Sequence, residues 1–377
     1  MHTLRIASLR HLLPLGGSWV LLRRPSSAPR RGTALRPLRD SGLRPKVASP
    51  GCPQYNHRQT PKYGSPVPAG VKFLRKGKVK EVYEASPTDL EFVFTDQISV
   101  FDKVIPSLVP HKGETLCRTS AHWFKVAEAA GIRTHFLRVV DGNRMRVRRV
   151  EVIRDYANIR PTSTNFLIPL EIITRYYVAG SLHDRLRNGK VRPEDVGFPR
   201  GHAPKYGEPL PEPFFEVTTK LEKVDRELGW DEALRISSLS RDELNELKET
   251  VRRIDARLNE EVRRRGLLHV DGKKEFAFDG ERRLMVVDTF GTADEDRFWD
   301  LAEYENGKQV ELSKEFVRQY YRQTGYHARL VEARERGLPE PDIPTLPPDV
   351  LTQVSDLYVS LYERLTGEAF RSSSGST

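Results

Sequence analysis

Cysteine is nearly absent from this chain, since only Cys52 and Cys117 occur in 377 residues. Two cysteines exclude a disulfide framework and a cysteine-based zinc site, and a reducing compartment is the simplest environment for them. The sequence also lacks a run of about 18 apolar residues, the length that a membrane-spanning helix needs. It lacks the GxxxxGKS or GxxxxGKT loop with which many proteins bind nucleotide phosphates. We therefore expect a cytoplasmic protein with no membrane partner.

Acidic residues are scarce in the first part of the chain. Residues 1–70 hold 12 lysines and arginines against one acid, Asp40, so this segment carries a net charge of +11. The other 307 residues hold 50 basic and 51 acidic side chains, a net charge of −1. The overall charge of +10 therefore belongs to a leader, and the composition of the remaining chain does not support binding to nucleic acid.

The leader, residues 1–70, is rich in arginine, proline, serine and glycine and has no sustained hydrophobic periodicity, which predicts disorder. Three explanations stay open: a transit peptide for import into an organelle, a basic interaction tail, or a translation start placed too far upstream. We favour the last because the predicted domain begins abruptly at Val71.

Strand and helix signals are interspersed after Val71, which predicts an α+β fold of antiparallel sheets with flanking helices. The predicted strands are 79–84, 91–95, 134–140, 144–150 and 170–178. The predicted helices are 115–130, 239–266, 313–324 and 348–365. A capping box, Ser240 with Glu243, marks the start of the second helix. Residues 187–213, rich in proline and glycine, predict a long surface loop. The expected divisions are an N-terminal lobe at 71–155, a C-terminal lobe at 156–368 and a disordered tail at 369–377.

Two groups of polar residues early in the domain are candidates for binding. Lys78 and Lys80 lie one pleat apart on a predicted strand, where their ammonium groups suit nucleotide phosphates. Lysines that simply face solvent are the structural alternative. Asp96, Ser99 and Asp102 surround apolar residues in a predicted loop and suit an amine or sugar hydroxyls. Asx-turn hydrogen bonds would explain the same residues without any ligand.

A second candidate site combines an arginine, a small residue and a hydroxyl. Arg175 lies on a predicted apolar strand, and the chain then reaches Gly180 and Ser181. A guanidinium fork in this setting suits a phosphate monoester, whereas pairing with a structural acid is the alternative. Arg297, in a later polar loop, could complete a phosphate clamp with Arg175.

The most informative segment is 270–299, where two predicted strands flank a turn signal at 279–280. Glu275 and Asp288 on these strands suit Mg²⁺, which prefers oxygen ligands; partnered strand-end acids are the alternative. A two-residue hairpin loop would leave Asp288 about 13 Å from the residue opposite Glu275. The metal interpretation therefore predicts a wider loop or a bulge, whereas a tight turn would make Asp271 the better partner of Asp288.

Seven sequence blocks occur in an order that resembles one known family. They are GKVKEVYE, TDQISVFD, IPSLVPHKGETL with SAHWF, EIITRYYVAGS, EVTTK, DGKKEF and VDTFGTADEDRFW. From about Val71 to Tyr320 they resemble the phosphoribosylaminoimidazole-succinocarboxamide synthases, or SAICAR synthetases. The resemblance implies a two-lobed α+β fold with ATP in the cleft between the lobes. It also implies an ATP-dependent ligase of de novo purine synthesis, which joins L-aspartate to the carboxylate of carboxyaminoimidazole ribonucleotide.

The resemblance implies roles for the candidate residues. The implied ATP contacts are Lys78, Lys80, Lys220 and Glu275, and the implied Mg²⁺ ligands are Glu275 and Asp288. The implied contacts with the 5′-phosphate are Arg175, Ser181 and Arg297, with Asp294 near the ribose or base. The implied contacts in the substrate or aspartate region are Asp96, Ser99 and Asp102. The residues implied in catalysis are Lys78, Asp288 and Asp294.

Three positions depart from the pattern of many members. Thr289 follows Asp288 where glutamate is common, and Ala293 and Ala277 stand where proline and glycine are usual. We expect an active enzyme of a divergent branch, with carboxyaminoimidazole ribonucleotide, aspartate and ATP as its partners and a homo-oligomer left open. A small-molecule kinase that uses the same lysines and acids is the alternative enzyme. A nucleic-acid-binding protein that acts through its leader is the alternative outside enzymes.

Overall fold

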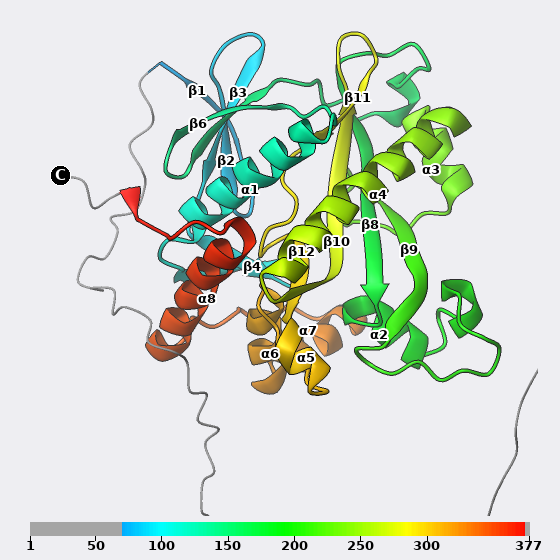
Figure 1. Ribbon diagram of the computed structural model, residues 1–377, viewed down its shortest axis with the longest axis vertical. Coiled ribbons are helices and arrows are strands. Elements are labelled where there is room, and N and C mark those ends of the chain that lie inside the picture. Colours follow the sequence, from blue (N-terminus) through cyan, green and yellow to red (C-terminus); the bar gives the residue numbers. More distant parts are fainter. Residues whose placement is uncertain (1–69, 374–377) are drawn as a thin grey trace, which may run out of the picture. The chain divides into compact units, whose positions relative to one another are not determined.

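The computed structural model describes residues 70–373 of the chain. The predicted leader, apart from Gly70, and the last four residues of the predicted tail lie outside the described residues. The described residues belong to one compact unit, Pro61–Thr377, and they form three antiparallel sheets and eight α-helices (Figure 1).

The first sheet has the strand order β1-β2-β3-β7-β6 and is antiparallel throughout. Its strands are β1 (Lys72–Lys76), β2 (Lys80–Glu84), β3 (Asp89–Phe94), β6 (Phe136–Asp141) and β7 (Arg144–Arg148). Val82, Phe92 and Met145 lie opposite one another on neighbouring strands, and they are buried in the core. The predicted strands in this region match β2, β3, β6 and β7 to within two residues at each end.

A two-stranded sheet of β4 (Gln97–Val100) and β5 (Lys103–Leu108) leads into helix α1 (Lys112–Ala129). Trp123 of α1 is buried, and its Nε1 donates a hydrogen bond of 2.8 Å to the carbonyl of Gly291. Gly113 at the start of the helix lies so close to β3 that a Cβ there would be 2.5 Å from the carbonyl oxygen of Phe94. Helix α1 therefore contacts both β3 of the first sheet and the segment around Gly291, which precedes the strand Asp296–Asp300 of the second sheet.

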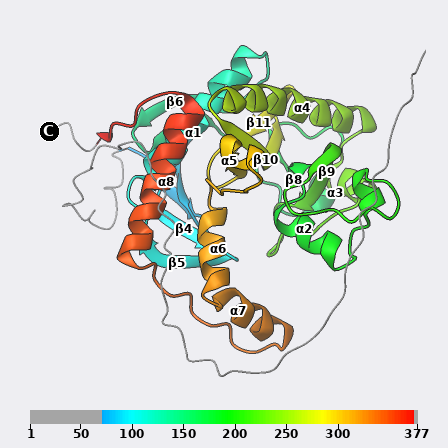
Figure 2. The ribbon, with the colours of Figure 1, turned by 60° about the horizontal axis from the view of Figure 1, so that its bottom comes forward.

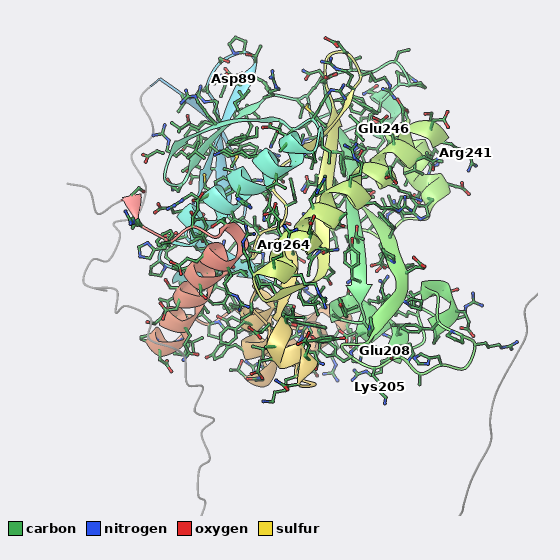
Figure 3. The ribbon with its side chains drawn as sticks, in the orientation of Figure 1. Asp89, Lys205, Glu208, Arg241, Glu246 and Arg264 are labelled. Atoms are coloured by element: carbon green, nitrogen blue, oxygen red, sulfur yellow. The ribbon has the colours of Figure 1, made fainter. Side chains whose placement is uncertain are left out.

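The second sheet has the strand order β11-β10-β8-β9, and β12 also pairs with β10. Its strands are β8 (Phe166–Tyr177), β9 (Pro209–Thr219), β10 (Leu267–Phe278), β11 (Leu284–Val287) and β12 (Asp296–Asp300). Helix α4 (Arg241–Arg264) packs on β10 (Figure 1). Its ends are marked by Arg241 and Arg264 in Figure 3. The predicted capping box is confirmed, because Ser240 accepts from the backbone N–H of Glu243 and Glu243 accepts from that of Ser240.

The remaining helices surround these sheets. They are α2 (Gly180–Arg187), α3 (Trp230–Ser237), α5 (Leu301–Glu305), α6 (Glu315–Gln323), α7 (Tyr326–Glu335) and α8 (Pro348–Thr366), with 3₁₀ turns at Tyr156–Asn158 and Pro193–Val196. Helix α8 lies beside α1, and α6 leads directly into α7 (Figure 2). One hydrophobic core includes residues of both large sheets, among them Phe94 and Phe276. The predicted lobe boundary at residue 155 lies between the two sheets, and the division itself stays a prediction.

The hairpin between β10 and β11 is wider than a two-residue turn. Glu275 pairs with Val287, and Phe278 pairs with Leu284. A turn follows in which Asp279 accepts from the N–H of Arg282, and Arg282 has a left-handed backbone with φ of 58°. The wider loop that the metal interpretation predicts is therefore confirmed, and Asp288 is the residue directly after the partner of Glu275.

Four expectations about local structure were wrong. Ser99 and Arg297 were expected in loops but lie on the strands β4 and β12, because neighbouring strands offer them pairing partners. Residues 187–213 are not all loop, because a 3₁₀ turn forms at Pro193–Val196 and β9 starts at Pro209. Residue Lys78 lies in a bend before β2 and so does not share a strand with Lys80. Phe370 was expected in a disordered tail but is 2% exposed and packs against Tyr362. Burial of a large aromatic ring is favourable because it removes apolar surface from water.

Among the described residues, no helix is long and apolar enough to cross a membrane.

Replacing Phe370 by alanine should lower the free energy of unfolding by about 3 kcal/mol, the usual cost of deleting a buried phenylalanine ring. The ring packs edge-on against His111 and Tyr362 and lies near the guanidinium of Arg118. Phe73→Ala is the matched control, because Phe73 is 50% exposed and its loss should cost about 1 kcal/mol or less. Denaturant unfolding would measure both, and equal losses would show that Phe370 is not part of the core.

Candidate functional site

Lysines and carboxylates from both large sheets meet at one place. We name this group the lysine–acid cluster, and its members are Lys80, Glu171, Lys220, Lys273, Glu275, Asp288 and Glu295. Alternation along β10 places Lys273 and Glu275 on the same face of the strand. Glu171 lies opposite Glu275 on the neighbouring strand β8. The cluster is thus built on the central pair of the second sheet and closed by Lys80 from the first.

The contacts within the lysine–acid cluster are short and shared. Lys220 Nζ lies 2.6 Å from Glu275 Oε1 and 3.9 Å from Asp288 Oδ2, and Lys80 contacts Asp288 directly. Lys273 Nζ lies 3.1 Å from Glu275 Oε1 and 3.2 Å from Glu295 Oε2. The structure therefore brings the two predicted metal ligands, Glu275 and Asp288, to one lysine.

The ionisation of the cluster is shaped by burial and by neighbouring charges. Burial raises the pKa of Glu275, but Lys273 and Lys220 outweigh this effect and lower the pKa to about 2. Burial lowers the pKa of Lys80 to about 7, against the attraction of Glu275 and Glu295. Glu275 is therefore ionised at neutral pH, whereas the charge of Lys80 near neutral pH depends on the charges of the groups that lie beside it.

The backbone at Asp288 turns sharply. Its φ is 62°, a left-handed conformation that is uncommon outside glycine. The carbonyl oxygen of Asp288 lies 3.3 Å from Nε2 of the buried His135. This turn takes the chain out of β11 and keeps the carboxylate of Asp288 beside Lys80.

The predicted residues Arg175, Ser181 and Arg297 also meet, together with Asp271. We name these four residues the arginine clamp. Arg175 Nη2 donates to Ser181 Oγ at 3.0 Å and Nη1 lies 3.3 Å from Asp271 Oδ2, which Arg297 contacts as well. Gly180 has φ of 52°, and a Cβ there would lie 2.6 Å from Arg297 Nη2. The glycine therefore lets the start of α2 reach the guanidinium of Arg297.

Further acids hold both guanidinium groups of the clamp in place. Arg175 contacts Glu216 of β9, and Arg297 Nη2 lies 3.1 Å from Glu315 Oε2 of α6. Behind Arg297, Glu311 accepts hydrogen bonds of 2.8 Å from Trp299 Nε1 and 2.9 Å from the hydroxyl of Tyr206. The orientation of the two arginines is therefore fixed before any ligand arrives.

Asp294 lies in a buried group of its own. Its Oδ2 is 2.9 Å from Lys112 Nζ and 3.6 Å from Lys314 Nζ, and its Oδ1 accepts a hydrogen bond of 2.5 Å from the Tyr358 hydroxyl. Burial opposes ionisation, but the two lysines lower the pKa of Asp294 well below its usual range. With both oxygens occupied by protein groups, Asp294 is placed to hold Lys112 and Tyr358, and its contact with ribose or base stays a prediction.

The other predicted residues lie along the β4–β5 sheet. Asp96 accepts a hydrogen bond of 2.9 Å from the backbone N–H of Gly113, and burial raises its pKa. Ser99 is buried on β4. Asp102 is exposed at the turn between the strands, and its Oδ1 lies 2.5 Å from Lys78 Nζ. Lys78 and Lys80 thus have different partners, Asp102 and Asp288.

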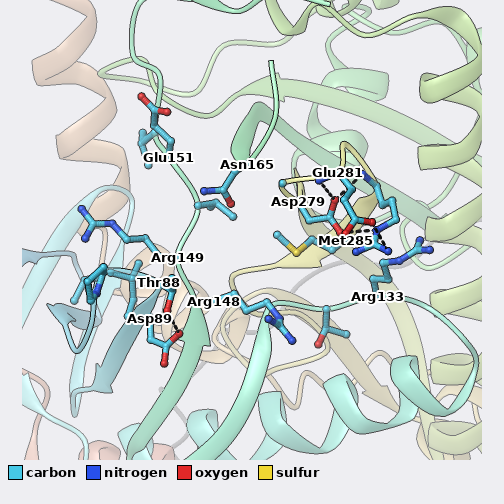
Figure 4. Close-up of a pocket in the computed structure, with 18 of the residues that line it drawn as sticks. Thr88, Asp89, Arg133, Arg148, Arg149, Glu151, Asn165, Asp279, Glu281 and Met285 are labelled. Atoms are coloured by element: carbon cyan, nitrogen blue, oxygen red, sulfur yellow. Dashed lines mark hydrogen bonds and ion pairs between the residues drawn. The ribbon is translucent and has the colours of Figure 1, made fainter. Parts of the chain in front are cut away.

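A cavity of about 1130 Å³ lies between the first sheet and the β10–β11 hairpin. Thr88 and Asp89 line one side of it and Asp279 and Glu281 line the other (Figure 4). Its apolar lining includes Val82, Leu90, Val152 and Met285. Val82 is two residues from Lys80 on β2, and Met285 is three residues before Asp288, so β2 and β11 each run from the cavity to the lysine–acid cluster.

The described residues contain no group of three or more histidine, cysteine or acidic side chains arranged to hold a metal ion. A metal in the lysine–acid cluster would therefore take Glu275 and Asp288 from the protein and need other oxygen ligands from substrate or water. Such a shared shell is usual for Mg²⁺, which dehydrates reluctantly.

Sequence reasoning missed several members of these groups. Lys273 could have been found, because it lies one pleat from Glu275 on a predicted strand. Glu171 and Glu295 come from separate segments and gave no local signal. Lys112 was quoted within a sequence block but assigned no role, and nothing in the sequence indicated that it would be completely buried beside Asp294.

Comparison with known proteins gives one consistent result. The sequence model of the SAICAR synthetase family matches residues 73–333. The phosphoribosylaminoimidazole-succinocarboxamide synthase of Thermoplasma acidophilum is 56% identical over 298 residues, which cover 79% of this chain and 99% of that protein. Its counterpart from Thermoplasma volcanium is 55% identical with the same coverage.

Two solved structures show the same fold. A SAICAR synthetase in complex with ADP is 25% identical, with a TM-score of 0.57 over 79% of this chain and 99% of that chain. The SAICAR synthase from Saccharomyces cerevisiae in complex with SAICAR is 23% identical, with a TM-score of 0.63 over 81% of this chain and 98% of that chain. The predicted α+β fold of this family is confirmed.

Glu311→Gln should stabilise the protein more at pH 8 than at pH 5. Burial raises the pKa of Glu311 to about 7, so the folded state keeps a proton that the unfolded state releases between about pH 4.5 and 7, and wild-type stability falls as the pH rises through that window. Glutamine keeps the acceptor oxygen for Trp299 and Tyr206 without the charge. The stability difference between variant and wild type should grow by up to about 3 kcal/mol across the window.

Denaturant unfolding at the two pH values would measure this difference. The exposed Glu305→Gln is the control and should give the same difference at both values. A Glu311→Gln effect that is independent of pH would contradict the burial argument.

Proposed function

Because the chain belongs to the SAICAR synthetase family, we propose that it joins L-aspartate to the carboxylate of carboxyaminoimidazole ribonucleotide and converts ATP to ADP and phosphate. The single observation that carries this proposal is strand β10. Its residue Asp271 belongs to the arginine clamp and its residue Glu275 to the lysine–acid cluster. Four residues along a strand span about 13 Å. Strand β10 therefore sets the distance between the arginine clamp, which suits a phosphate monoester, and the lysine–acid cluster, which suits the phosphates of ATP.

The chemistry requires activation of a carboxylate. An anionic carboxylate resists attack by an amine and has a poor leaving group, so the proposed first step transfers the γ-phosphoryl group of ATP to a carboxylate oxygen and releases ADP. The amine of aspartate then attacks the carbon of this acyl phosphate, the new C–N bond forms, the amine loses a proton and phosphate leaves. Both steps develop negative charge that fixed cations stabilise.

The proposed ATP site combines the cavity with the lysine–acid cluster. The apolar lining at Val82, Leu90 and Met285 suits the flat nucleobase. Two strands lead from there to Lys80, which together with Lys220 would contact the phosphates. Burial lowers the pKa of Lys80 to about 7. The anionic oxygens of the phosphates would raise it again and so keep Lys80 protonated. Lys78 pairs with the exposed Asp102 in the structure. In the proposed complex it would exchange this surface contact for a phosphate.

Mg²⁺ is part of the proposal. The side chains of Glu275 and Asp288 fit it, because they are two adjacent carboxylates of the donor type that Mg²⁺ prefers. When bound, the ion would neutralise charge on the phosphates during phosphoryl transfer. The protein's own contribution is to keep Glu275 ionised, because Lys273 and Lys220 lower its pKa to about 2.

The proposed ribonucleotide site is the arginine clamp. The guanidinium groups of Arg175 and Arg297 and the hydroxyl of Ser181 would hold the 5′-phosphate. The acids Asp271 and Glu216 would keep both arginines oriented, so little side-chain freedom is lost on binding. Asp294 would act on the substrate through Lys112. The aspartate region would be bordered by Asp96, Ser99 and Asp102. A cytoplasmic location and a homo-oligomer stay predictions.

Purified protein incubated with carboxyaminoimidazole ribonucleotide, aspartate, ATP and Mg²⁺ should release ADP and form the amide product. ADP measurement and mass spectrometry would follow both. Omission of aspartate should abolish amide formation. ADP release that is unchanged without ribonucleotide and aspartate would contradict the proposal, and a phosphorylated product without an amide would identify a kinase instead. Removal of residues 1–70 should leave the activity intact if the leader has no part in it.

Arg175→Ala should raise the KM for the ribonucleotide by roughly 10-fold to 100-fold, the cost of losing a hydrogen-bonded charge partner. The KM for ATP should change far less, because Lys80 and Lys220 lie on other segments. Arg192→Ala is the matched control: Arg192 pairs with Asp195 on the surface and has a side chain that is 74% exposed. Steady-state kinetics with each substrate varied would decide, and equal loss of affinity for both substrates would contradict the assigned role.

A further inference from the structure

A second group of charges lies on the opposite face of β10, between the strand and helix α4. Lys274 Nζ is 2.6 Å from Asp255 Oδ1 and 3.8 Å from Asp296 Oδ2. His269 Nε2 is 2.8 Å from the same Asp296 Oδ2. All four side chains are at most 1% exposed. We name these residues the buried quartet. None of them has a part in the proposed chemistry.

Hydrogen bonds connect the buried quartet to its neighbours. The hydroxyl of Tyr176 donates to Asp255 Oδ2 at 2.8 Å. His269 Nδ1 lies 2.8 Å from Asn259 Oδ1 of helix α4, and His269 Nε2 lies 2.8 Å from Asp296 Oδ2. The ring of His269 therefore connects α4 to the start of β12.

The charges of the buried quartet are paired. Burial lowers the pKa of Lys274, but the carboxylates of Asp255 and Asp296 outweigh this effect and raise it. Buried ions are tolerated when a charge of opposite sign lies beside them in this way. Loss of one partner would leave an unpaired ion away from water.

Asp296 links the buried quartet to the proposed site. Its Oδ1 accepts a hydrogen bond of 2.8 Å from the backbone N–H of Gly291, and its own backbone begins β12, directly before Arg297. One carboxylate thus joins the end of the loop at Asp296 to Gly291, which lies three residues after Asp288. Gly272 makes room for it, because a Cβ at residue 272 would overlap Asp296 Oδ2.

We propose that the buried quartet of Asp255, His269, Lys274 and Asp296 positions Arg297 of the arginine clamp relative to Asp288 of the lysine–acid cluster. These are positioning residues, since none of them reaches either group of ligand-binding side chains directly. The inference rests on the proposed function only for the identity of the ligand that Arg297 holds.

The positioning role is tested by kinetics of Asp296→Asn and Gly272→Ala, two variants that disturb the carboxylate by charge and by contact. Each should raise the KM for the ribonucleotide about tenfold or more, in the range known for partners that orient ligand-binding groups, with a much smaller change in the KM for ATP. A merely stabilising network would reduce the folded fraction and kcat but leave both KM values unchanged, and that result would overturn the proposal.

Two further variants separate positioning from loss of folding. Lys248→Met removes a lysine charge from α4 beside Trp230, away from the quartet, and should leave both KM values unchanged. The pair Asp255→Asn with Lys274→Met removes one charge of each sign, so it should unfold at a higher temperature than either single variant. Additive losses in the pair would contradict this pairing of charges. If the wild type forms no amide, the proposed function fails, whereas the thermal unfolding of the pair still decides whether the quartet acts as one unit.

Discussion

Charges buried on both faces of strand β10 must be balanced by charges that other elements bring to them. On one face Glu275 meets Lys220, which follows β9. On the other face Lys274 meets Asp255 of α4 and Asp296 at the start of β12. Because an unpaired buried ion costs several kcal/mol, these elements pack stably only where the partners meet. The requirement that holds the second sheet and α4 together therefore also sets the distance between the arginine clamp and the lysine–acid cluster.

The fold could be predicted where a local pattern and the tertiary environment agree. Helix α4 has a capping box and a regular apolar stripe, and its predicted range contains the observed one. Strand β9 was missed because Pro209, Pro211 and Pro213 read as a loop signal; a strand forms there because β8 offers a partner, and no local pattern contains that information. The buried position of Phe370 likewise depends on α1 and α8, which are distant in the sequence.

The residues of the site also fall into those that could be predicted from the sequence and those that could not. The residue patterns indicated Glu275, Asp288, Arg175 and Arg297 as candidates, the resemblance to a family assigned their roles, and the structure brings them together in the expected pairs. The width of the hairpin was predicted from geometry, because one Mg²⁺ can reach both Glu275 and Asp288 only with a loop of more than two residues or a bulge. The partners that set the ionisation of these groups could not be predicted, since each contact crosses between segments that are far apart in the sequence. The location of Asp294 shows this most clearly, because a residue three positions before Arg297 belongs to a different buried group.

The charge of the lysine–acid cluster bears on how it accepts a nucleotide. Three lysines meet four carboxylates, so the cluster carries one net negative charge when all seven groups are ionised. Burial lowers the pKa of Lys80 to about 7, so the net charge becomes more negative as the pH rises past neutrality. A triphosphate is strongly anionic and would be repelled by the cluster alone. A Mg²⁺ held by Glu275 and Asp288, as proposed, would add two positive charges and reverse the sign. The cation would then assist the binding of the triphosphate as well as the transfer of its γ-phosphoryl group.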